Sequence, residues 1–450
     1  MHRRRLILLA VFFALALVIW QLPTILKAIP SRYVAAYLPE PLQALAEREH
    51  VEMLPTVAIS VNMDSLLAPP GSTPGPNAAA SPTEEISVTQ ETAAPSVRPP
   101  ATITTQPTAT PTVQPTLPPT RQSPPAPPAA RLDGVKHHFQ TWNNCGPATL
   151  AMALSYFGLD QNQEETAAIL KPDPEDRNVS PHEMADYVNN NTTLSAISRS
   201  NGNLDLLKRL LAAGFPVIVE LGLDPPGEYR WMGWYGHYLL VVAYDDQDEQ
   251  VWVFDSWFGT SEVPGENADA QGRIISYDEL DRYWRQFSRN YIAISESSQQ
   301  TDLAEIIGPA MDDESMWRMA LDQAREDLSR EQDNAFLWFN LGTAFNALGN
   351  YESAAAAFDQ ARTLGLPWRM LWYQFGPYEA YYNIGRYEDV VLLADVTLQD
   401  RPYFEESYYY RGLANIALGQ VEQAESDLER AVRRNPNYTP AAEALAQLET

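Results

Sequence analysis

Cysteine is almost absent from this sequence, because its 450 residues include only one, Cys145. One cysteine cannot form a disulfide within the chain, so cross-links of this kind do not hold the fold together. Two interpretations of the lone thiol are open. It is either a small apolar side chain packed in a core or a nucleophile, and the residues around it must decide.

Positive charge is also scarce. The chain has 31 Lys and Arg against 58 Asp and Glu, which gives a net charge of −27. Proteins that bind nucleic acids use basic patches to neutralise the phosphates, so this balance argues against that class. We expect no nucleic-acid partner.

Clusters of metal-binding residues are not evident. His137 and His138 are adjacent, and neighbouring side chains of an extended segment point in opposite directions. The acidic run at 245–249 suggests a calcium site, but a hairpin turn in water explains it more simply. We therefore expect no metal and no other cofactor.

The N-terminus contains a long apolar run. Residues 1–5 (MHRRR) are basic, and residues 6–26 are almost wholly apolar. About 20 apolar residues are enough to cross a bilayer, and the arginines keep the N-terminus in the cytoplasm. We expect residues 1–28 to form a basic tail and a single anchor in the cell membrane, with the remainder exported. The alternative is a cleaved signal peptide and a secreted protein.

The 36 prolines are unevenly distributed, and Pro, Thr, Ala and Ser dominate residues 68–131. This segment has too few bulky apolar residues to offset the entropy of ordering, and its prolines favour extended polyproline II. We expect a disordered stalk that holds the following domains away from the membrane. Residues 29–67 form a membrane-proximal segment with some helical periodicity and no evident chemistry.

Residues 132–298 have the pattern of a globular domain. Helices are predicted at 145–158, 179–188 and 203–213, and strands at 214–220, 237–244 and 250–255. Helices followed by paired strands are typical of an α+β fold.

Residues 299–450 are helical and repetitive. The segments 335–361 and 405–436 align with each other at the spacing of tetratricopeptide repeats, and a degenerate copy includes Tyr381, Gly385 and Tyr387. The period of about 34 residues is that of this repeat, so we expect an all-α solenoid; an ordinary helical bundle is the alternative. Such repeats imply a protein partner, and the excess of acidic residues favours a basic or neutral one.

Cys145 lies where the helix predicted at 145–158 begins. The unpaired N–H groups and the positive end of the helix dipole favour a thiolate there. Gln140, shortly upstream, can place its amide beside the Cys145 N–H, so that both donate to the oxyanion of a tetrahedral intermediate.

His237 opens one predicted strand and Asp255 ends the next. If three or five residues form the acidic turn between the two strands, the numbers of any two residues that lie opposite each other add up to 494. His237 then lies opposite Trp257. Asp255 is then one diagonal step away on the same face of the sheet and can orient the imidazole. A loop of two or four residues would reverse the parity and separate the two side chains.

Three segments together resemble a known family: QTWNNCGPA (140–148), GHYLLVVAYD (236–245) and VWVFD (251–255). They resemble the bacterial cysteine peptidase family thirty-nine, papain-like domains best known for removing double-glycine leaders from bacteriocins. The resemblance covers little more than a third of the chain. It implies a papain-like α+β fold with Cys145 as nucleophile, His237 as general base and acid, Asp255 as orienting residue and Gln140 as oxyanion donor.

The chain departs from the family pattern in two respects. Gln140 is five residues before Cys145, whereas papain-like enzymes commonly have six. Leader-processing members are fused to transport ATPases, but this sequence has no Gly-Lys-Ser/Thr phosphate-binding motif, so a bacteriocin substrate does not follow.

The sequence therefore predicts an exported cysteine peptidase that hydrolyses peptide or amide bonds, with repeats that bind the substrate or another protein. Two alternatives remain open. The domain is a non-catalytic module that binds peptides, or the same residues transfer an acyl group to an amine in place of water.

Overall fold

The computed structural model describes residues 21–22, 26, 53–57, 63–68, 125–224, 233–260 and 271–448. Residues 69–124 of the predicted stalk and nearly all of the predicted anchor lie outside these residues. Within the described part of the chain, no helix has the length and apolar character needed to cross a membrane.

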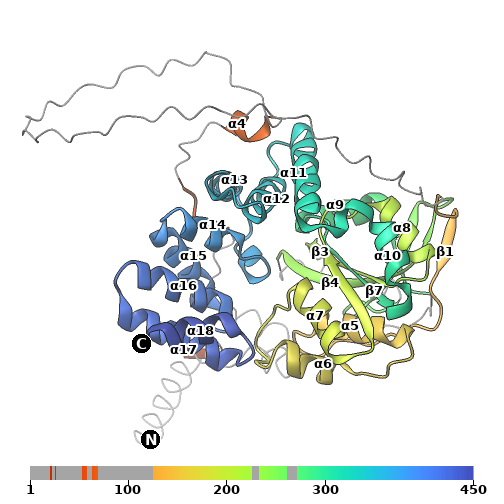
Figure 1. Cartoon of the computed structure of the whole chain (residues 1–450), viewed down its shortest axis with the longest axis horizontal. Helices are drawn as coiled ribbons and strands as arrows, with labels where there is room; N and C mark the ends of the chain where they lie inside the picture. Colours follow the sequence, from red (N-terminus) through yellow and green to blue (C-terminus); the bar gives the residue numbers. More distant parts are fainter. Residues whose placement is uncertain are drawn as a thin grey trace, which may run out of the picture. The chain divides into compact units, whose positions relative to one another are not determined.

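The described residues between 125 and 312 fold around an antiparallel sheet (Figure 1). Along the sheet the strands follow the order β2-β7-β3-β4-β5-β6, and β1 pairs with the end of β4 beside β3. The strands are β1 (Ala129–Arg131), β2 (Leu194–Arg199), β3 (Val217–Leu223), β4 (Tyr235–Asp245), β5 (Gln250–Asp255), β6 (Arg273–Ser276) and β7 (Tyr291–Glu296).

Helices cover both faces of this sheet. One face packs against α5 (Cys145–Tyr156), α6 (Gln163–Leu170) and α7 (Pro181–Asn191). The other packs against α8 (Leu204–Ala212), α9 (Tyr277–Trp284) and α10 (Gln300–Ile307). Strand periodicity explains the division: Leu240 and Val242 point into the first core, while Leu239 and Val241 point into the second. The result is a mixed α/β domain.

Both predicted borders of this domain differ from the structure. Ala129–Arg131 was expected in the stalk but forms β1, which hydrogen-bonds to β4. At the other end, Leu303 and Ile307 lie beyond the expected border at 298, yet they are buried in the core on the α8 face. The compact domain therefore extends past both borders.

The remaining chain is a series of packed helices (Figure 1). They are α11 (Asp313–Arg330), α12 (Ala335–Ala347), α13 (Tyr351–Thr363), α14 (Gly376–Asn383), α15 (Tyr387–Asp400), α16 (Glu405–Ala417), α17 (Val421–Arg434) and α18 (Thr439–Leu448). The helices α12 and α13 form one repeat, and α16 and α17 form another. Glycine permits the close approach within the first, since a Cβ on Gly342 would lie 2.6 Å from the Phe358 ring.

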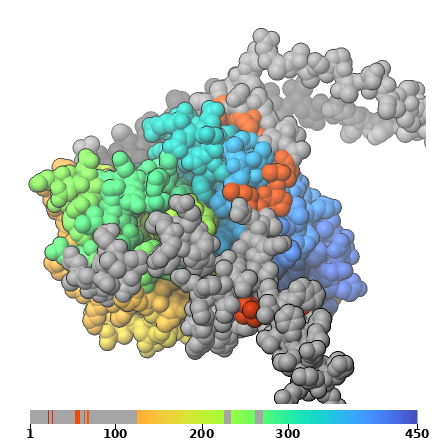
Figure 2. Space-filling model, turned by 180° about the vertical axis from the view of Figure 1, so that it is seen from behind, coloured from red at the N-terminus to blue at the C-terminus, as the bar shows by residue number. Residues whose placement is uncertain are grey.

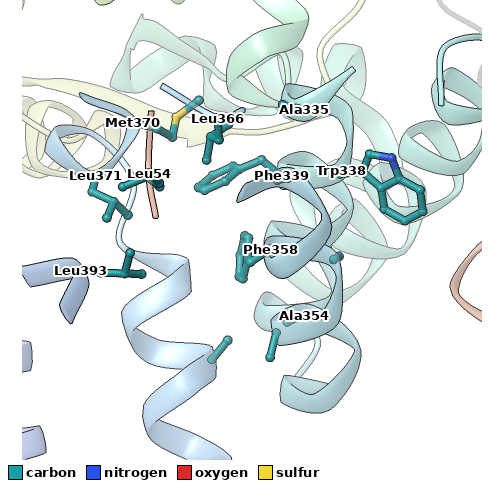
Figure 3. Packing of buried hydrophobic residues seen from close by; sticks show 14 of the residues in the cluster. Leu54, Ala335, Trp338, Phe339, Ala354, Phe358, Leu366, Met370, Leu371 and Leu393 are labelled. Atoms are coloured by element: carbon teal, nitrogen blue, oxygen red, sulfur yellow. The ribbon is translucent and has the colours of Figure 1, made fainter. Parts of the chain in front are cut away.

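The degenerate middle repeat consists of α14 and α15, and its first helix is short. A 3-10 turn, η5 (Trp368–Trp372), comes before α14 and takes part of the length that a full helix would need. Pro367 and Pro377 flank this turn and restrict the backbone on both sides. Figure 3 shows Met370 and Leu371 of this turn in the same apolar core as Phe339 and Phe358.

A short N-terminal segment packs on the repeats. Leu54 is 2% exposed and its N–H donates to Leu366 O at 2.9 Å. Arg362 Nε donates to Pro55 O at 2.8 Å. The helix α4 (Met63–Leu67) continues this contact, because Arg325 donates to Leu66 O at 3.1 Å. Figure 2 shows these residues in orange beside the blue repeats; part of the predicted membrane-proximal segment is thus docked on them.

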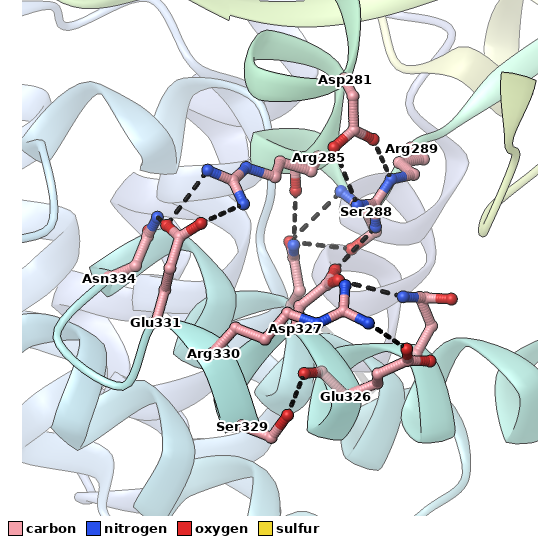
Figure 4. Close-up of polar contacts among 12 residues, drawn as sticks. Asp281, Arg285, Ser288, Arg289, Glu326, Asp327, Ser329, Arg330, Glu331 and Asn334 are labelled. Atoms are coloured by element: carbon pink, nitrogen blue, oxygen red, sulfur yellow. Dashed lines mark hydrogen bonds and ion pairs between the residues drawn. The ribbon is translucent and has the colours of Figure 1, made fainter. Parts of the chain in front are cut away.

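Ion pairs join the sheet domain to the first repeat helices (Figure 4). Arg285 binds Glu331 through both terminal nitrogens, at 2.6 and 3.1 Å. Arg289 bridges Asp281 in α9 and Asp327 in α11, each at 2.7 Å. These contacts hold α11 against the end of α9.

Aromatic packing continues the same interface. Trp234 stacks on Phe287 with ring centroids 5.7 Å apart and lies 5.4 Å from Phe336 of α12. Trp234 comes directly before β4, the strand that contains His237. The helical region therefore packs close to the predicted site.

Candidate active site

The chain makes a sharp turn into Cys145. Asn143 has a left-handed backbone (φ 54°), a conformation that asparagine tolerates better than most residues. Cys145 is then the first residue of α5 and is half-buried. Lys171 Nζ donates to Asn143 O at 3.1 Å and to Asp176 O at 2.6 Å, which ties this turn to the loop after α6. The sulfur thus lies at the positive end of a helix.

Two opposing effects act on the Cys145 thiol. Burial is the largest single effect and raises its pKa, whereas a hydrogen bond with His237 and the charge of that ring lower it. A main-chain hydrogen bond from Tyr238 and the charge of Lys171 lower it further, so the pKa lies below the ordinary value. The surroundings favour the thiolate, which is the nucleophilic form.

His237 lies near the start of β4 and is 2% exposed. Its Nε2 is 2.8 Å from Asp255 Oδ1, which leaves Nδ1 as the ring nitrogen for Cys145. Burial lowers the pKa of His237, but the charge and hydrogen bond of Asp255, together with Cys145, raise it to about 9. An imidazolium beside a thiolate is therefore the favoured state near neutral pH.

Asp255 is fully buried, and several donors satisfy its carboxylate. Besides His237, Oδ1 accepts from the N–H groups of Trp257 at 2.8 Å and Phe258 at 3.0 Å. Oδ2 accepts from Arg273 at 2.9 Å. Burial raises the pKa of Asp255, but His237, Arg273 and the Phe258 N–H outweigh it and keep the pKa well below its usual range.

A β-bulge brings His237 and Asp255 together. The acidic turn has four residues, 246–249, because Asp245 pairs with Gln250. Of the lengths left open by the sequence, this is one for which a regular ladder would have separated the two side chains. The register shifts between Val241 and Ala243, so that Leu239 pairs with Asp255 and positions sum to 494 as predicted. The extra residue restores the expected parity at the site.

Gln140 is anchored to the residue after Asp255. Its N–H donates to Ser256 O at 2.8 Å, and its side-chain Oε1 accepts from Ser256 Oγ at 2.8 Å. Because the amide oxygen accepts from Ser256, the amide nitrogen is the part of the side chain that can donate to another group. Five residues before Cys145, Gln140 is therefore fixed in place by the Asp255 end of β5.

The histidines weighed as metal ligands have another environment. His137 Nε2 is 2.7 Å from the main-chain oxygen of Asp255, and its ring packs edge-on against Phe139. In the ranges that the structure describes, no three His, Cys, Asp or Glu side chains are arranged to hold a metal ion.

Several residues around the site have no signal in the local sequence. Arg273 follows Asp255 by 18 residues and reaches it only because β6 pairs with β5. Lys171 and Ser256 likewise act through contacts that no local motif indicates. Glu220 in β3 is buried, and its Oε2 accepts from Asn290 Nδ2 at 2.7 Å. Burial raises its pKa to about 8, so the carboxyl group is mostly protonated at neutral pH. Only the pairing of β3 with β4 and of β6 with β5 could have placed Glu220 and Arg273 near the site. That prediction would have needed the register of both pairs.

Comparisons with known proteins identify the two kinds of domain in the chain. Residues 129–296 match the model of the peptidase C39-like family, and residues 337–363 and 405–438 each match a tetratricopeptide repeat. A search of the curated proteins found no match.

Two solved structures are similar to parts of the chain. A protein described as a C39-like peptidase from Bacillus anthracis is 16% identical (TM-score 0.29), and the match covers 37% of this chain and 96% of that one. MamA 41-end from Desulfovibrio magneticus RS-1 is 21% identical (TM-score 0.27), covering 30% of this chain and 74% of that one. By the family models, this chain contains a peptidase C39-like domain followed by tetratricopeptide repeats.

Proposed function

We propose that the chain is a cysteine peptidase that hydrolyses peptide or amide bonds. Cys145 is the nucleophile, His237 the general base and acid, and Asp255 the residue that orients His237. Gln140 and the Cys145 N–H donate to the oxyanion. The observation that carries this proposal is the 2.8 Å contact between His237 and Asp255 beside a thiol whose pKa is lowered.

The reaction follows from the charges at the site. The Cys145 thiolate attacks the carbonyl carbon, and the oxygen takes the negative charge between the two donors. As the C–N bond breaks, His237 Nδ1 gives its proton to the leaving amine, and a thioester remains on Cys145. His237 then takes a proton from water, which attacks the thioester carbonyl. The C–S bond breaks, which releases the acid and restores the Cys145 thiolate. Asp255 keeps the ring in the orientation that both proton transfers need.

The other parts of the chain have supporting roles in this proposal. Residues 1–28 anchor the protein in the cell membrane with its N-terminus in the cytoplasm, and the catalytic domain and repeats face the outside. The repeats bind a protein substrate or partner. Membrane fractionation with an alkaline wash tests the anchor: retention in the pellet supports it, and release into the medium supports signal cleavage.

One experiment uses the fact that Cys145 is the only thiol. The rate of alkylation by iodoacetamide is measured against pH on the full-length chain, and hydrolysis is measured on a mixed peptide pool. We expect the alkylation rate to reach its thiolate plateau well below the free-thiol pKa of about 8.5. We also expect His237→Ala to move this transition upward and Cys145→Ala to abolish hydrolysis.

The alternatives give different results. A thiol that titrates at or above its free value, in a chain that binds peptides without cleaving them, would establish a non-catalytic binding module. Acyl transfer would give amide products when an amine is added. A low thiol pKa together with Cys145-dependent hydrolysis supports the peptidase.

A further inference from the structure

The turn η5 of the helical repeats lies against the start of β4. Arg369 Nη1 donates to the main-chain oxygen of Trp234 at 3.1 Å. Trp234 precedes His237 by three residues, so this contact holds the chain that leads to the catalytic histidine. The contact joins residues 135 positions apart in the sequence.

Tyr373, the residue after η5, contacts the residue before His237. A Cβ on Gly236 would lie 3.1 Å from the Tyr373 ring and 2.8 Å from Phe287, so only glycine allows this approach. The Gly236 N–H faces the Tyr373 hydroxyl oxygen and, as a donor to it, acts to lower the pKa of the phenol. The side chain is 8% exposed and packs edge-on against Trp234 and Phe287. Tyr373 is thus enclosed between the repeats and the base of β4.

The same hydroxyl is close enough to the sulfur to sense its charge. Burial raises the pKa of Tyr373, and the negative charge of the Cys145 thiolate raises it further. The phenol therefore stays protonated over the range in which the thiolate forms. It is a neutral group held in place next to Gly236.

A second contact reaches the turn before Cys145. The Arg177 guanidinium lies 5.3 Å from the ring centroid of Trp142 and 5.3 Å from that of Trp372 in η5. Trp142 precedes Cys145 by three residues. The repeats therefore contact the segments that contain both residues of the proposed catalytic pair. Tyr373 contacts β4 just before His237, and Trp372 contacts Arg177, which in turn packs on Trp142 just before Cys145.

We propose that the repeats complete the active site, with Tyr373 as a positioning residue that holds Gly236 and so sets His237 against Cys145. This inference rests on the proposed peptidase function and adds a part of the machinery that the sheet domain alone does not contain. The repeats and the catalytic domain then form one working unit.

The test compares Tyr373→Phe with Tyr378→Phe in the full-length chain. Tyr378 is a matched control because it is also buried and its hydroxyl is hydrogen-bonded, but to Thr397 and Ser407 within the repeats. The readout is the pH profile of Cys145 alkylation, with thermal unfolding to compare the folds. A typical hydrogen bond of about 1 kcal/mol corresponds to roughly fivefold, so we expect Tyr373→Phe to slow alkylation at pH 6 by about that factor. The rate at high pH should stay unchanged.

Gly236→Ala is the second variant, and it should displace the Tyr373 ring and shift the profile further in the same direction. Tyr378→Phe should lower the unfolding temperature without moving the profile. If both Tyr373→Phe and Gly236→Ala keep the profile of the parent chain, the positioning role is wrong while the proposed function stands. If the parent chain itself shows no early plateau, the activated thiol and the proposed function fail instead.

Discussion

At the scale of single residues, the Asp255 carboxylate is the most constrained group of the site. Four donors from three elements converge on it, and it is fully buried. Its low pKa means that its charge stabilises the fold above the ordinary carboxyl pKa of about 3.9, and this contribution is lost as the pH falls below that value. Orientation of His237 and stability of the fold therefore depend on the same charge.

Replacing Asp255 with Asn should affect both properties. Arg273 would face a neutral amide and His237 would lose its counter-charge. Breaking a buried ion pair costs about 3 kcal/mol or more, so we expect the unfolding free energy to fall by about that amount. The thiol pKa should rise toward its ordinary value. Urea unfolding and the alkylation profile measure the two effects.

Asp248→Asn is the control for this variant, since Asp248 is exposed in the turn between β4 and β5. It should change neither measurement. An Asp255→Asn chain with the parent's alkylation profile would show that Asp255 has no part in activating the thiol.

The pKa of His237 predicts the upper limit of activity. The folded-state pKa is about 9 against an ordinary 6.5, so the protonated ring stabilises the fold fully below 6.5. This contribution is lost as the pH rises through about 9. The leaving amine also needs this proton. We therefore expect kcat/KM for a peptide substrate to fall above about pH 9, with a plateau below it. A rate that keeps rising past that pH would contradict the role of His237 as general acid.

At the scale of helices and strands, local patterns predicted much of the site. The helix start at Cys145 and the strand Gln250–Asp255 occur at the expected residues, because capping, dipole and alternation are local properties. The four-residue turn and the bulge after Val241 were not predictable in the same way. The turn changes the register of β4 and β5 by one residue, and the bulge changes it back. Arg273 and Lys171 depend on pairing between distant segments, which a single sequence does not reveal.

Two of the ion pairs made by helix α11 should differ in strength. Asp327 pairs with Arg289 at 2.7 Å and its side chain is 6% exposed. Glu314 pairs with Arg318 one turn along the helix, and both side chains are about two-thirds exposed. The first joins α11 to the sheet domain, while the second lies in solvent.

We expect Asp327→Asn to lower the unfolding free energy by about 2 kcal/mol, because it leaves the Arg289 charge half-satisfied in a buried interface. The exposed pair is the control, because Glu314→Gln should change the unfolding free energy by at most about 0.5 kcal/mol. Urea unfolding of the full-length chain measures both. Equal effects of the two substitutions would mean that the interface with α11 adds little to stability.

At the scale of the whole molecule, the sheet domain and the repeats are less separate than their distinct sequence patterns suggest. The periodicity of the repeats indicates where they begin. It does not indicate that Leu303 and Ile307 pack into the sheet domain, or that Leu54 packs on the repeats. Those contacts depend on surface shape, which periodicity does not encode. The family models also describe each module alone. The junction between modules is thus the part of the fold that the structure adds.

This junction also contains a group of buried acidic side chains. Asp176 of the sheet domain and Glu405 and Glu406 of α16 are each less than 10% exposed. Their charges interact, together with those of Glu183 and Asp173, and Lys171, Arg177 and Arg434 are bases close to this group. Burial raises the pKa of Glu405 to about 7, although Asn435 Nδ2 donates to it at 2.7 Å. At higher pH the junction must hold uncompensated negative charge.

The Glu405 carboxyl group should make the stability of the fold depend on pH. Its pKa is about 7 in the folded chain and 4.5 ordinarily, so the folded state binds this proton more tightly. The contribution to stability is therefore complete below 4.5 and is lost as the pH rises to about 7. Glu405→Gln removes the charge but keeps an oxygen that accepts from Asn435. At pH 8 the variant should unfold with a free energy up to about 3 kcal/mol higher than the parent, and at pH 4 the two should be equal. Glu425 lies at an exposed position of α17, so Glu425→Gln should leave the unfolding free energy unchanged at both pH 4 and pH 8. A Glu405→Gln chain less stable than the parent at pH 8 would mean that the ionised carboxylate holds the two modules together instead of straining their junction.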